Sequence, residues 1–185
     1  MRITGGMAKG HKLSGPKTAV VRPTADMVKE ALFNILAPYI DETVFLDLFA
    51  GTGSVGLEAI SRGAREVYFV DNKRQCVQLI KNNASLLRMS DKAKIISADA
   101  IAAVDLLSRK QVRFDIIFMD PPYEMGYISK VLKAIVSADI LNKSGILVIQ
   151  RSKREALGLD DVGWSVYKER AYGDTILDFI RREDD

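Results

Sequence analysis

The sequence has one cysteine, Cys76, and one histidine, His11, among its 185 residues. A single cysteine excludes a disulfide within the chain, and the two residues are too few for a zinc site built from cysteine and histidine. They also exclude a catalytic serine or cysteine that is activated by a histidine of the core. We therefore expect chemistry that uses carboxylates, backbone groups and a bound cofactor, without a metal.

The chain also lacks a long hydrophobic run. No apolar stretch reaches the length of a membrane span, and the N-terminus has charged residues and glycines where a signal peptide would be apolar. A hydrophobic content of 48% over 185 residues suits one domain with a sizeable core. We expect a cytoplasmic, monomeric protein without a membrane partner.

Acidic residues are missing from the first 25 positions. This segment has glycines at positions 5, 6, 10 and 15 and five cations, Arg2, Lys9, Lys12, Lys17 and Arg22, whereas the whole chain has a net charge of only +3. We divide the chain into a basic arm or hairpin, residues 1–24, and a domain, residues 25–185. The arm either lies along phosphates or is a solubilising tail, and charge alone does not distinguish the two.

The rest of the chain alternates helical and strand patterns, which indicates a parallel sheet covered on both faces. Trp164–Lys168 and Ile176–Ile180 have no helix between them, and Gly173-Asp174 suits a hairpin turn. We predict an α/β fold with a mostly parallel, seven-stranded sheet whose last strand is antiparallel. Helices are predicted over 25–37, with Thr24 as N-cap, from after Gly56 to about Gly63, and over 73–88, 100–108 and 127–137. Strands are predicted over 43–49, 66–70, 94–98, 114–119 and 145–149.

Carboxylates follow three successive predicted strands, at Asp71, Asp99 and Asp120. In an open parallel sheet, ligands bind outside the carboxyl ends of the strands, and a glycine loop such as Gly51-Thr52-Gly53 lets the backbone approach a ligand closely. Asp71 lies twenty residues after Gly51, which is near the spacing at which an acid accepts hydrogen bonds from ribose. Together these features indicate a ligand that contains adenosine.

Each of these features also has a more ordinary interpretation. The pattern Gly51-x-Gly53-x-x-Gly56 is weak by itself, and an aspartate after a strand caps a helix more often than it binds a ligand. The ligand site is favoured because all the features occur at the same edge of one predicted sheet.

The segment Asp120-Pro121-Pro122-Tyr123 follows the apolar run 114–119. The two prolines have no N–H group, so their backbone offers only carbonyl acceptors in a stiff geometry. Asp120 adds acceptor oxygens, and Tyr123 adds an aromatic face for stacking. The segment therefore suits a flat ring with an amino group, such as a nucleobase.

Two cofactor classes fit the glycine loop. One is a nicotinamide dinucleotide, which would make the protein an NAD-dependent oxidoreductase. Against it, Asp47 precedes the glycines within the first strand, where its charge would repel a pyrophosphate. The same charge would suit the cationic amino end of a ligand derived from methionine.

Asp47 to Gly53, the strand-end acids and Asp120 to Tyr123 resemble S-adenosylmethionine-dependent methyltransferases of Rossmann-like fold. Segments 2–6, 22–26, 30–36 and 172–175 extend the match over nearly the whole chain, and the chain is similar to the RsmD family of bacterial 16S rRNA guanine-N2 methyltransferases. This resemblance implies S-adenosylmethionine as cofactor. It also implies methyl transfer to the exocyclic N2 amine of a guanine in 16S rRNA, within a small-subunit assembly particle.

The resemblance implies roles for individual residues. Asp47 and the glycine loop would hold the methionine part, Asp71 the ribose and Asp99 the adenine, while Asp120 and the Pro121 carbonyl would accept from the target amine. The residues implied at the cofactor are Asp47, Ala50, Gly51, Thr52, Gly53, Asp71, Asn72, Asp99, Ala100 and Asp120, and those implied in methyl transfer are Asp120, Pro121, Pro122 and Tyr123.

RNA phosphates would be bound by Arg2, Lys9, Lys12, Lys17 and Arg22, with Arg22 to Thr24 closing over the methionine end. Family members often carry an acid near the end of the fifth strand, whereas this chain has Gln150, Arg151 and Lys153. We therefore add Arg151 and Lys153 to the expected RNA contacts. Two alternatives stay open beside the oxidoreductase: methylation of the exocyclic amine of adenine in DNA or RNA, and an RNA-binding assembly factor without turnover.

Overall fold

The computed structural model describes residues 1–15, 23–122, 126–159 and 163–183. Three residues singled out in the sequence, Lys17, Arg22 and Tyr123, lie outside these ranges. Within the described residues, no helix is both long enough and apolar enough to cross a bilayer.

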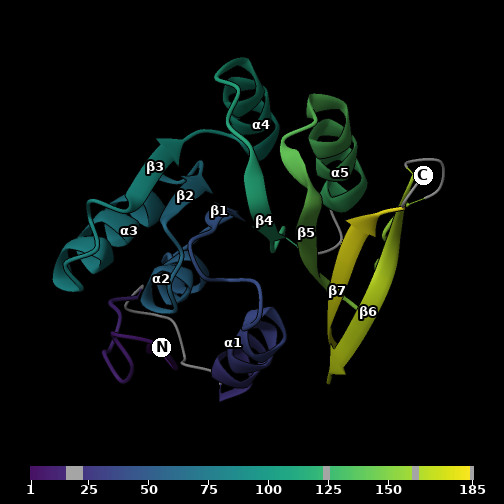
Figure 1. The fold of residues 1–185 in the computed structure, drawn as a ribbon. Helices are drawn as coiled ribbons and strands as arrows, with labels where there is room; N and C mark the ends of the chain where they lie inside the picture. Colours follow the sequence, from purple (N-terminus) through teal and green to yellow (C-terminus); the bar gives the residue numbers. More distant parts are fainter. Residues whose placement is uncertain (16–22, 123–125, 160–162, 184–185) are drawn as a thin grey trace.

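Seven strands form one sheet in the order β3-β2-β1-β4-β5-β7-β6 (Figure 1). The first five strands are parallel to one another, and β7 is antiparallel to both β5 and β6. The α/β class, the mostly parallel sheet and the antiparallel last strand are thus confirmed. The strands are β1 (Val44–Leu48), β2 (Glu66–Asp71), β3 (Ala93–Ser97), β4 (Phe114–Met119), β5 (Leu141–Ser152), β6 (Trp164–Tyr172) and β7 (Thr175–Arg182).

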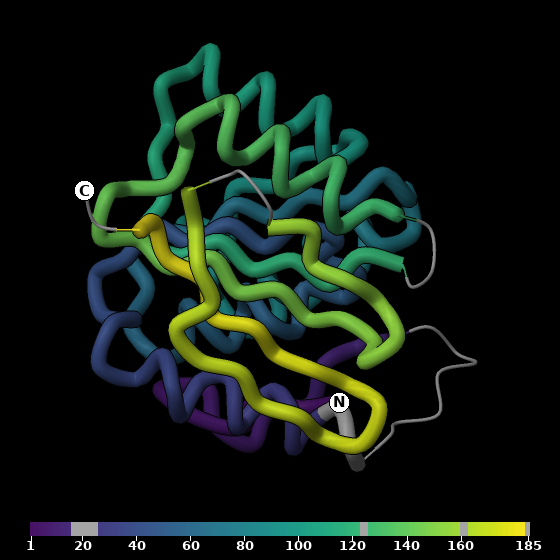
Figure 2. Tube along the Cα trace, turned by 90° about the vertical axis from the view of Figure 1, so that its right-hand side faces the viewer, coloured from purple at the N-terminus to yellow at the C-terminus, as the bar shows by residue number. Residues whose placement is uncertain are grey.

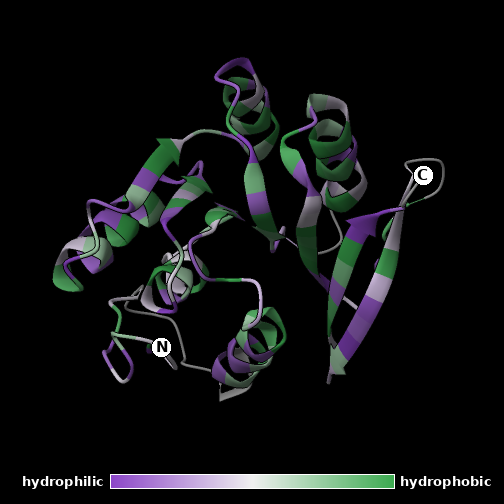
Figure 3. Ribbon diagram, in the orientation of Figure 1, coloured by the Kyte–Doolittle hydropathy of each residue, from purple (hydrophilic) through white to green (hydrophobic). Residues whose placement is uncertain are grey.

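Helices cover both faces of the sheet, as Figure 2 shows with the sheet between two helical layers. Each helix carries hydrophobic colour beside hydrophilic colour in Figure 3, as expected for an element with one buried face. One layer contains α1 (Pro23–Leu36), α2 (Ser54–Ser61) and α3 (Arg74–Leu86). The other contains α4 (Ala100–Arg109) and α5 (Tyr127–Ala138).

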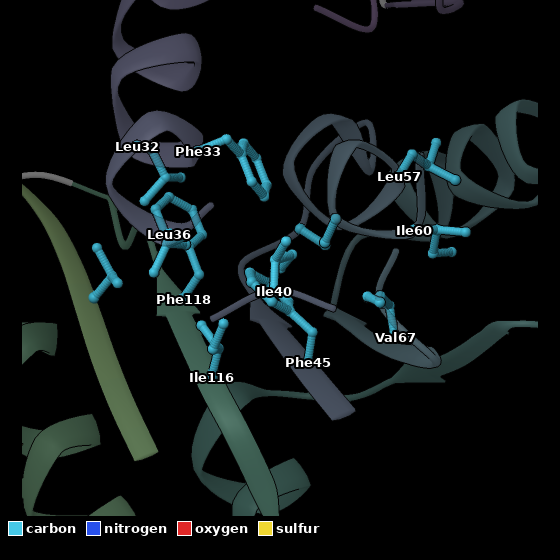
Figure 4. Packing of buried hydrophobic residues seen from close by; sticks show 14 of the residues in the cluster. Leu32, Phe33, Leu36, Ile40, Phe45, Leu57, Ile60, Val67, Ile116 and Phe118 are labelled. Atoms are coloured by element: carbon cyan, nitrogen blue, oxygen red, sulfur yellow. The ribbon is translucent and has the colours of Figure 1, made fainter. Parts of the chain in front are cut away.

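The larger hydrophobic cluster joins α1 and α2 to the sheet (Figure 4). Leu32, Phe33 and Leu36 of α1 are at most 1% exposed and pack in the same cluster as Phe45 of β1 and Phe118 of β4. Burying such side chains contributes roughly 1.5–3 kcal/mol each relative to exposure. This cluster holds α1 and α2 beside the carboxyl ends of β1 and β4.

Residues 1–14 form a compact hairpin, closed by an antiparallel bridge between Arg2 and Lys12. Ile3, Ala8 and Leu13 are buried in the cluster that also contains α1 and α2. The interpretation as a solvated tail is therefore wrong for this segment, because its apolar side chains are part of the core.

Several predicted boundaries were wrong. Helix α1 begins at Pro23, so Thr24 lies in its first turn and is not the N-cap. A proline suits the first helical position because that N–H has no partner within the helix. Strand β5 begins at Leu141 and not at Gly145, since Leu141 pairs with Phe114 across a register shift. Met27 of α1 stands at helical spacing with Ala31, Leu32 and Ile35, which would predict a place on the buried face, but its side chain is 54% exposed.

Candidate active site

The sheet order reverses between β1 and β4, and both strands end at the same edge of the sheet. Two adjoining cavities of about 610 and 680 Å³ open there, and Phe49, Gly51 and Asp120 line both. Such a switch point is where ligands bind in open α/β sheets. The first cavity is also lined by Asp71, Asn72, Asp99, Ala100, Pro121 and Pro122, and the second by Asp47, Ala50, Thr52, Gln150 and Asp174.

The loop between β1 and α2 has an unusual backbone. Gly51 and Gly53 have φ values of 56° and 78°, in the left-handed region that glycine tolerates. A Cβ on Gly53 would lie 3.3 Å from Ile80, so a larger residue would also crowd α3. Phe49 has a φ of 63°, which costs a bulky residue roughly 1–3 kcal/mol. Phe49 was not predicted to line the site, because nothing in the sequence indicates a positive φ at an aromatic residue.

Asp71 holds two backbone segments together. Its Oδ2 accepts from the Gly51 N–H at 2.9 Å, and its Oδ1 accepts from the Lys73 N–H at 2.8 Å. The carboxylate therefore fixes the glycine loop and the start of α3 while it faces the first cavity. Each oxygen keeps a second lone pair that can accept from a ligand hydroxyl.

Asp99 caps helix α4, which is the role that an aspartate after a strand has most often. Its Oδ1 accepts from the Ile101 N–H at 3.0 Å at the start of α4. The residue also lines the first cavity with Ala100, so capping and a ligand contact are compatible. The same cavity contains Lys73 and Cys76, which the sequence analysis did not assign to the site.

Asp47 is 1% exposed and lies in the centre of the sheet. Its Oδ2 accepts from the Gly56 N–H at 2.8 Å. Burial, together with the negative charges of Asp120 and Asp71, raises the pKa of Asp47 to about 8. A cationic group in the second cavity would favour the ionised carboxylate and offset the cost of burying it.

Asp120 lies where the two cavities meet. Burial raises the pKa of Asp120 to about 7, while a hydrogen bond from the Gln150 side chain opposes the shift. Pro121 is buried and Pro122 is exposed, and both line the first cavity. Gln150 was not assigned to the site from the sequence, although a polar residue that ends the apolar run 146–149 is a detectable signal.

A buried charge network joins the hairpin to α1 and α2. Lys29 Nζ lies 3.2 Å from Glu58 Oε2 and donates to the Arg2 carbonyl at 2.5 Å. The fully buried Glu58 also accepts from the Thr4 N–H at 2.8 Å and from Arg62 Nε at 2.8 Å. Burial raises the pKa of Glu58, but the hydrogen bonds from Thr4 and Arg62 bring it below its usual value. The network holds the hairpin beside the second cavity, which Met1 and Lys29 line.

The cations expected at RNA fall into two groups. Arg2, Lys9 and Lys12 are exposed on the hairpin. Arg151, in contrast, is 9% exposed, and its Nε donates to Asp178 Oδ2 at 2.6 Å between β5 and β7. Lys153 is exposed but lies 2.5 Å from Asp174 Oδ1. We correct the assignment of Arg151, whose guanidinium is already paired in the sheet.

The described residues contain no group of three or more histidine, cysteine, aspartate or glutamate side chains placed to hold a metal ion.

Comparisons with known proteins agree with this geometry. The sequence model of the family described as "Conserved hypothetical protein 95" matches residues 1–181. Ribosomal RNA small subunit methyltransferase D of Escherichia coli is 33% identical over 184 residues, which cover 99% of this chain and 90% of that protein. The protein of the same name from Haemophilus influenzae is 34% identical over 176 residues, which cover 94% of this chain and 89% of that protein.

Solved structures give the same result. The Escherichia coli protein yhhF has a TM-score of 0.85 at 30% identity and covers 100% of this chain and 99% of its own. The Thermus thermophilus protein TTHA0928 has a TM-score of 0.82 at 30% identity, with 98% of this chain and 99% of its own covered. The likeness in sequence and structure over almost the full length shows that the chain belongs to the RsmD family of methyltransferases.

Proposed function

We propose that the protein transfers a methyl group from S-adenosylmethionine to the exocyclic N2 amine of a guanine in 16S rRNA. The observation that carries this proposal is the meeting of two cavities at Asp120. One cavity is lined by acids at the ends of β2 and β3, and the other by the buried Asp47. A cofactor and a target base can thereby meet at one carboxylate.

The residues present fit S-adenosylmethionine. The first cavity offers acceptors to a nucleoside from Asp71 and Asp99. Gly51 lines both cavities, and a Cβ added there would meet only the Phe49 carbonyl oxygen, at 4.0 Å, so the glycine loop leaves room for backbone contact with the methionine part. Asp47, whose burial disfavours its ionised form, would gain a cationic partner in the ligand's amino group.

The bound cofactor would supply an electrophilic methyl group on a sulfonium. Asp120 and the Pro121 carbonyl would accept hydrogen bonds from the target amine and orient its lone pair toward that methyl group. Positive charge develops on the nitrogen during transfer, and the carboxylate of Asp120 would stabilise it. Alignment would supply much of the remaining acceleration, since well-oriented intramolecular reactions reach effective molarities of about 10⁵ M or more.

The choice of 16S rRNA is supported by the names of the two relatives, which are small subunit rRNA methyltransferases. The exposed cations Arg2, Lys9 and Lys12 would contact phosphates, and the target base would leave its stack to enter the site. A chain of this size reads little sequence, so we expect the shape of a small-subunit assembly particle to select the nucleotide. From the resemblance to the RsmD family we further propose guanine 966 as the methylated nucleotide. We expect the protein to act as a monomer in the cytoplasm.

A labelling experiment tests the proposal. The protein is incubated with labelled S-adenosylmethionine and one of three acceptors: naked 16S rRNA, small-subunit particles without the modification, or duplex DNA. Label on N2 of one guanine, with the particles as the best acceptor, is the expected result. Label on adenine, or on DNA alone, would contradict the guanine assignment and favour the adenine alternative, which the Asp-Pro-Pro-Tyr segment also allows.

The two remaining alternatives make different predictions. An oxidoreductase would be stabilised against heat by NADH and not by S-adenosylmethionine, and membership of a methyltransferase family speaks against it. An assembly factor without turnover would bind the particles and transfer no label.

A further inference from the structure

We propose that the exposed face of α3 and its C-terminal turn bind the phosphate backbone of the RNA beside the target nucleotide. This inference rests on the proposed function and extends it to a second surface outside the basic hairpin. The surface consists of Arg74, Lys81 and Arg88, which we call the α3 cations.

The charge of this segment is entirely of one sign. From Lys73 to Ser90 the sequence contains four cations and no acid, and Lys92 and Lys94 follow after Asp91. Arg74 and Lys81 are seven residues apart, so they lie on the same side of the helix, and both are exposed. Within the described part of the chain, none of the α3 cations makes an ion pair or a side-chain hydrogen bond.

The two cations at the start of α3, Lys73 and Arg74, destabilise the helix by their position. Lys73 is the N-cap of α3 and Arg74 its first residue, where the helix dipole disfavours positive charge. The residues three and four positions after Arg74 are Val77 and Gln78, so no acid compensates it locally. Helix α4 shows the opposite arrangement, because Arg109 stands in its last turn and pairs with Asp105 at 2.7 Å. The charges of α3 therefore suit an external anion better than they suit the helix.

The hairpin packs against the buried side of α3. The fully buried Asn83 of α3 accepts from the Ser14 N–H at 2.8 Å and donates to the Ser14 carbonyl at 3.0 Å. Residues two apart on a helix point in nearly opposite directions, so Lys81 faces away from this contact, and the α3 cations form a second basic face, distinct from Lys12 on the hairpin. Figure 1 shows the hairpin next to α2 and α3 on one side of the sheet.

The same contact reaches the cofactor loop. Asn83 also donates to the Thr52 carbonyl at 2.9 Å, and Lys73 at the start of α3 lines the first cavity. A phosphate chain that follows the exposed face of α3 toward Lys73 would therefore reach the edge of the first cavity. Charge complementarity identifies the occupant as a nucleic acid backbone, since each phosphate carries one negative charge.

The experiment compares two variants that lose the same charge. In the first, Arg74→Gln, Lys81→Gln and Arg88→Gln are combined. In the control, Lys110→Gln, Lys133→Gln and Lys143→Gln remove three exposed cations from the end of α4, from α5 and from the start of β5. Binding to small-subunit particles without the modification is measured over a range of salt concentrations, together with methyl transfer and with the affinity for S-adenosylhomocysteine.

For the α3 variant, we expect affinity for RNA to fall about tenfold or more near physiological salt. The magnitude of the salt slope should fall by about 2–3, because each lost phosphate contact contributes roughly 0.7–0.9. The affinity for S-adenosylhomocysteine should not change, and the control variant should retain the wild-type slope.

The outcomes separate the two proposals. A wild-type protein that transfers no label to 16S rRNA, either naked or in the particles, would overturn the proposed function. An active wild-type protein whose salt slope is unchanged in the α3 variant would overturn only the α3 surface. Equal losses in both variants would also overturn it, because they would show a general effect of net charge.

Discussion

The two cavities at the edge of the sheet use carboxylates in opposite ways. In the first, Asp71 and Asp99 accept from backbone N–H groups and so hold the glycine loop, α3 and α4 in place. In the second, Asp47 is buried and has a pKa of about 8, and Asp120, at the junction, has a pKa of about 7. Asp71 and Asp99 therefore stabilise the backbone around the cavity even without a ligand. Asp47 and Asp120 are electrostatically unfavourable when ionised, and a positive charge would relieve this.

This difference explains how one sheet edge can both hold a cofactor and favour transfer. S-adenosylmethionine is positively charged at its amino end and its sulfonium, and in the proposed reaction positive charge moves to the target amine. Carboxylates that are poorly solvated interact with such charges more strongly than exposed carboxylates do.

The largest effect is expected for Asp120→Ala. The variant loses the acceptor for the target amine, and we expect methyl transfer to fall on the order of 10²–10³-fold, by analogy with the loss of one preorganised group in other enzymes. S-adenosylhomocysteine should bind as tightly as before or more tightly, because removing Asp120 removes a negative charge that raises the pKa of Asp47. Single-turnover rates and calorimetry measure the two effects. Retained activity would contradict the role of Asp120.

Asp47→Asn should weaken cofactor binding by roughly 10–100-fold, the equivalent of about 1.4–2.7 kcal/mol. The amide oxygen can still accept from the Gly56 N–H, so the fold should survive. The folded-state pKa of Asp47 is raised, so its contribution to stability is present below the unfolded pKa and is lost as the pH rises toward 8. The variant should therefore gain stability relative to wild type between pH 4 and 8. A loss of stability at pH 8 would contradict this account.

The affinity for S-adenosylhomocysteine should depend on pH in the wild type. Below pH 8 the free protein increasingly holds a proton on Asp47, and ligand binding must displace it. We expect affinity to fall by up to about tenfold per pH unit from pH 7.5 to pH 6. Titrations in buffers of different ionisation enthalpy should detect proton release on binding. The Asp47→Asn variant is the control, and its affinity should change little over the same range.

The smallest effect is expected for Asp99→Asn. Asparagine caps a helix about as well as aspartate, so the start of α4 and the melting temperature should stay unchanged. Only the charge in the first cavity is lost, and we expect an affinity loss of a few fold at most. Asp99→Ala should in addition destabilise the protein by about 1 kcal/mol through loss of the cap. A large loss of affinity in Asp99→Asn would show that the two cavities do not differ as described.

Much of the architecture could be predicted because it depends on local patterns. The alternation of strands and helices, the hairpin around Gly173-Asp174 and the acids at the strand ends all follow from sequence periodicity. Gly173 indeed has a φ of 61°, which a tight turn uses. Since the carboxyl ends of parallel strands meet at one edge, Asp71, Asp99 and Asp120 could be placed together without coordinates.

The wrong predictions share one cause, which is contact between segments that are far apart in the sequence. Arg151 reads as a free cation in the sequence, but the register of β5 and β7 brings it against Asp178. Likewise, the glycines and cations of residues 1–14 do not reveal that Ile3 and Leu13 are part of the core. Charge and flexibility are visible in a sequence, whereas ion pairing and burial depend on which surfaces meet.

The sequence alone accounts for the fold class, for the edge of the sheet where the two cavities open and for many of the residues that line them, but not for Phe49 or Gln150. These properties depend on the period of hydrophobic residues and on the few residue types that turns and strand ends accept. Which carboxylates hold backbone segments in place, and which are unfavourable when ionised, depends on contacts made in the folded protein. The distinction arises from burial, which raises the pKa of Asp47 and Asp120, and from the backbone N–H groups that Asp71 and Asp99 reach.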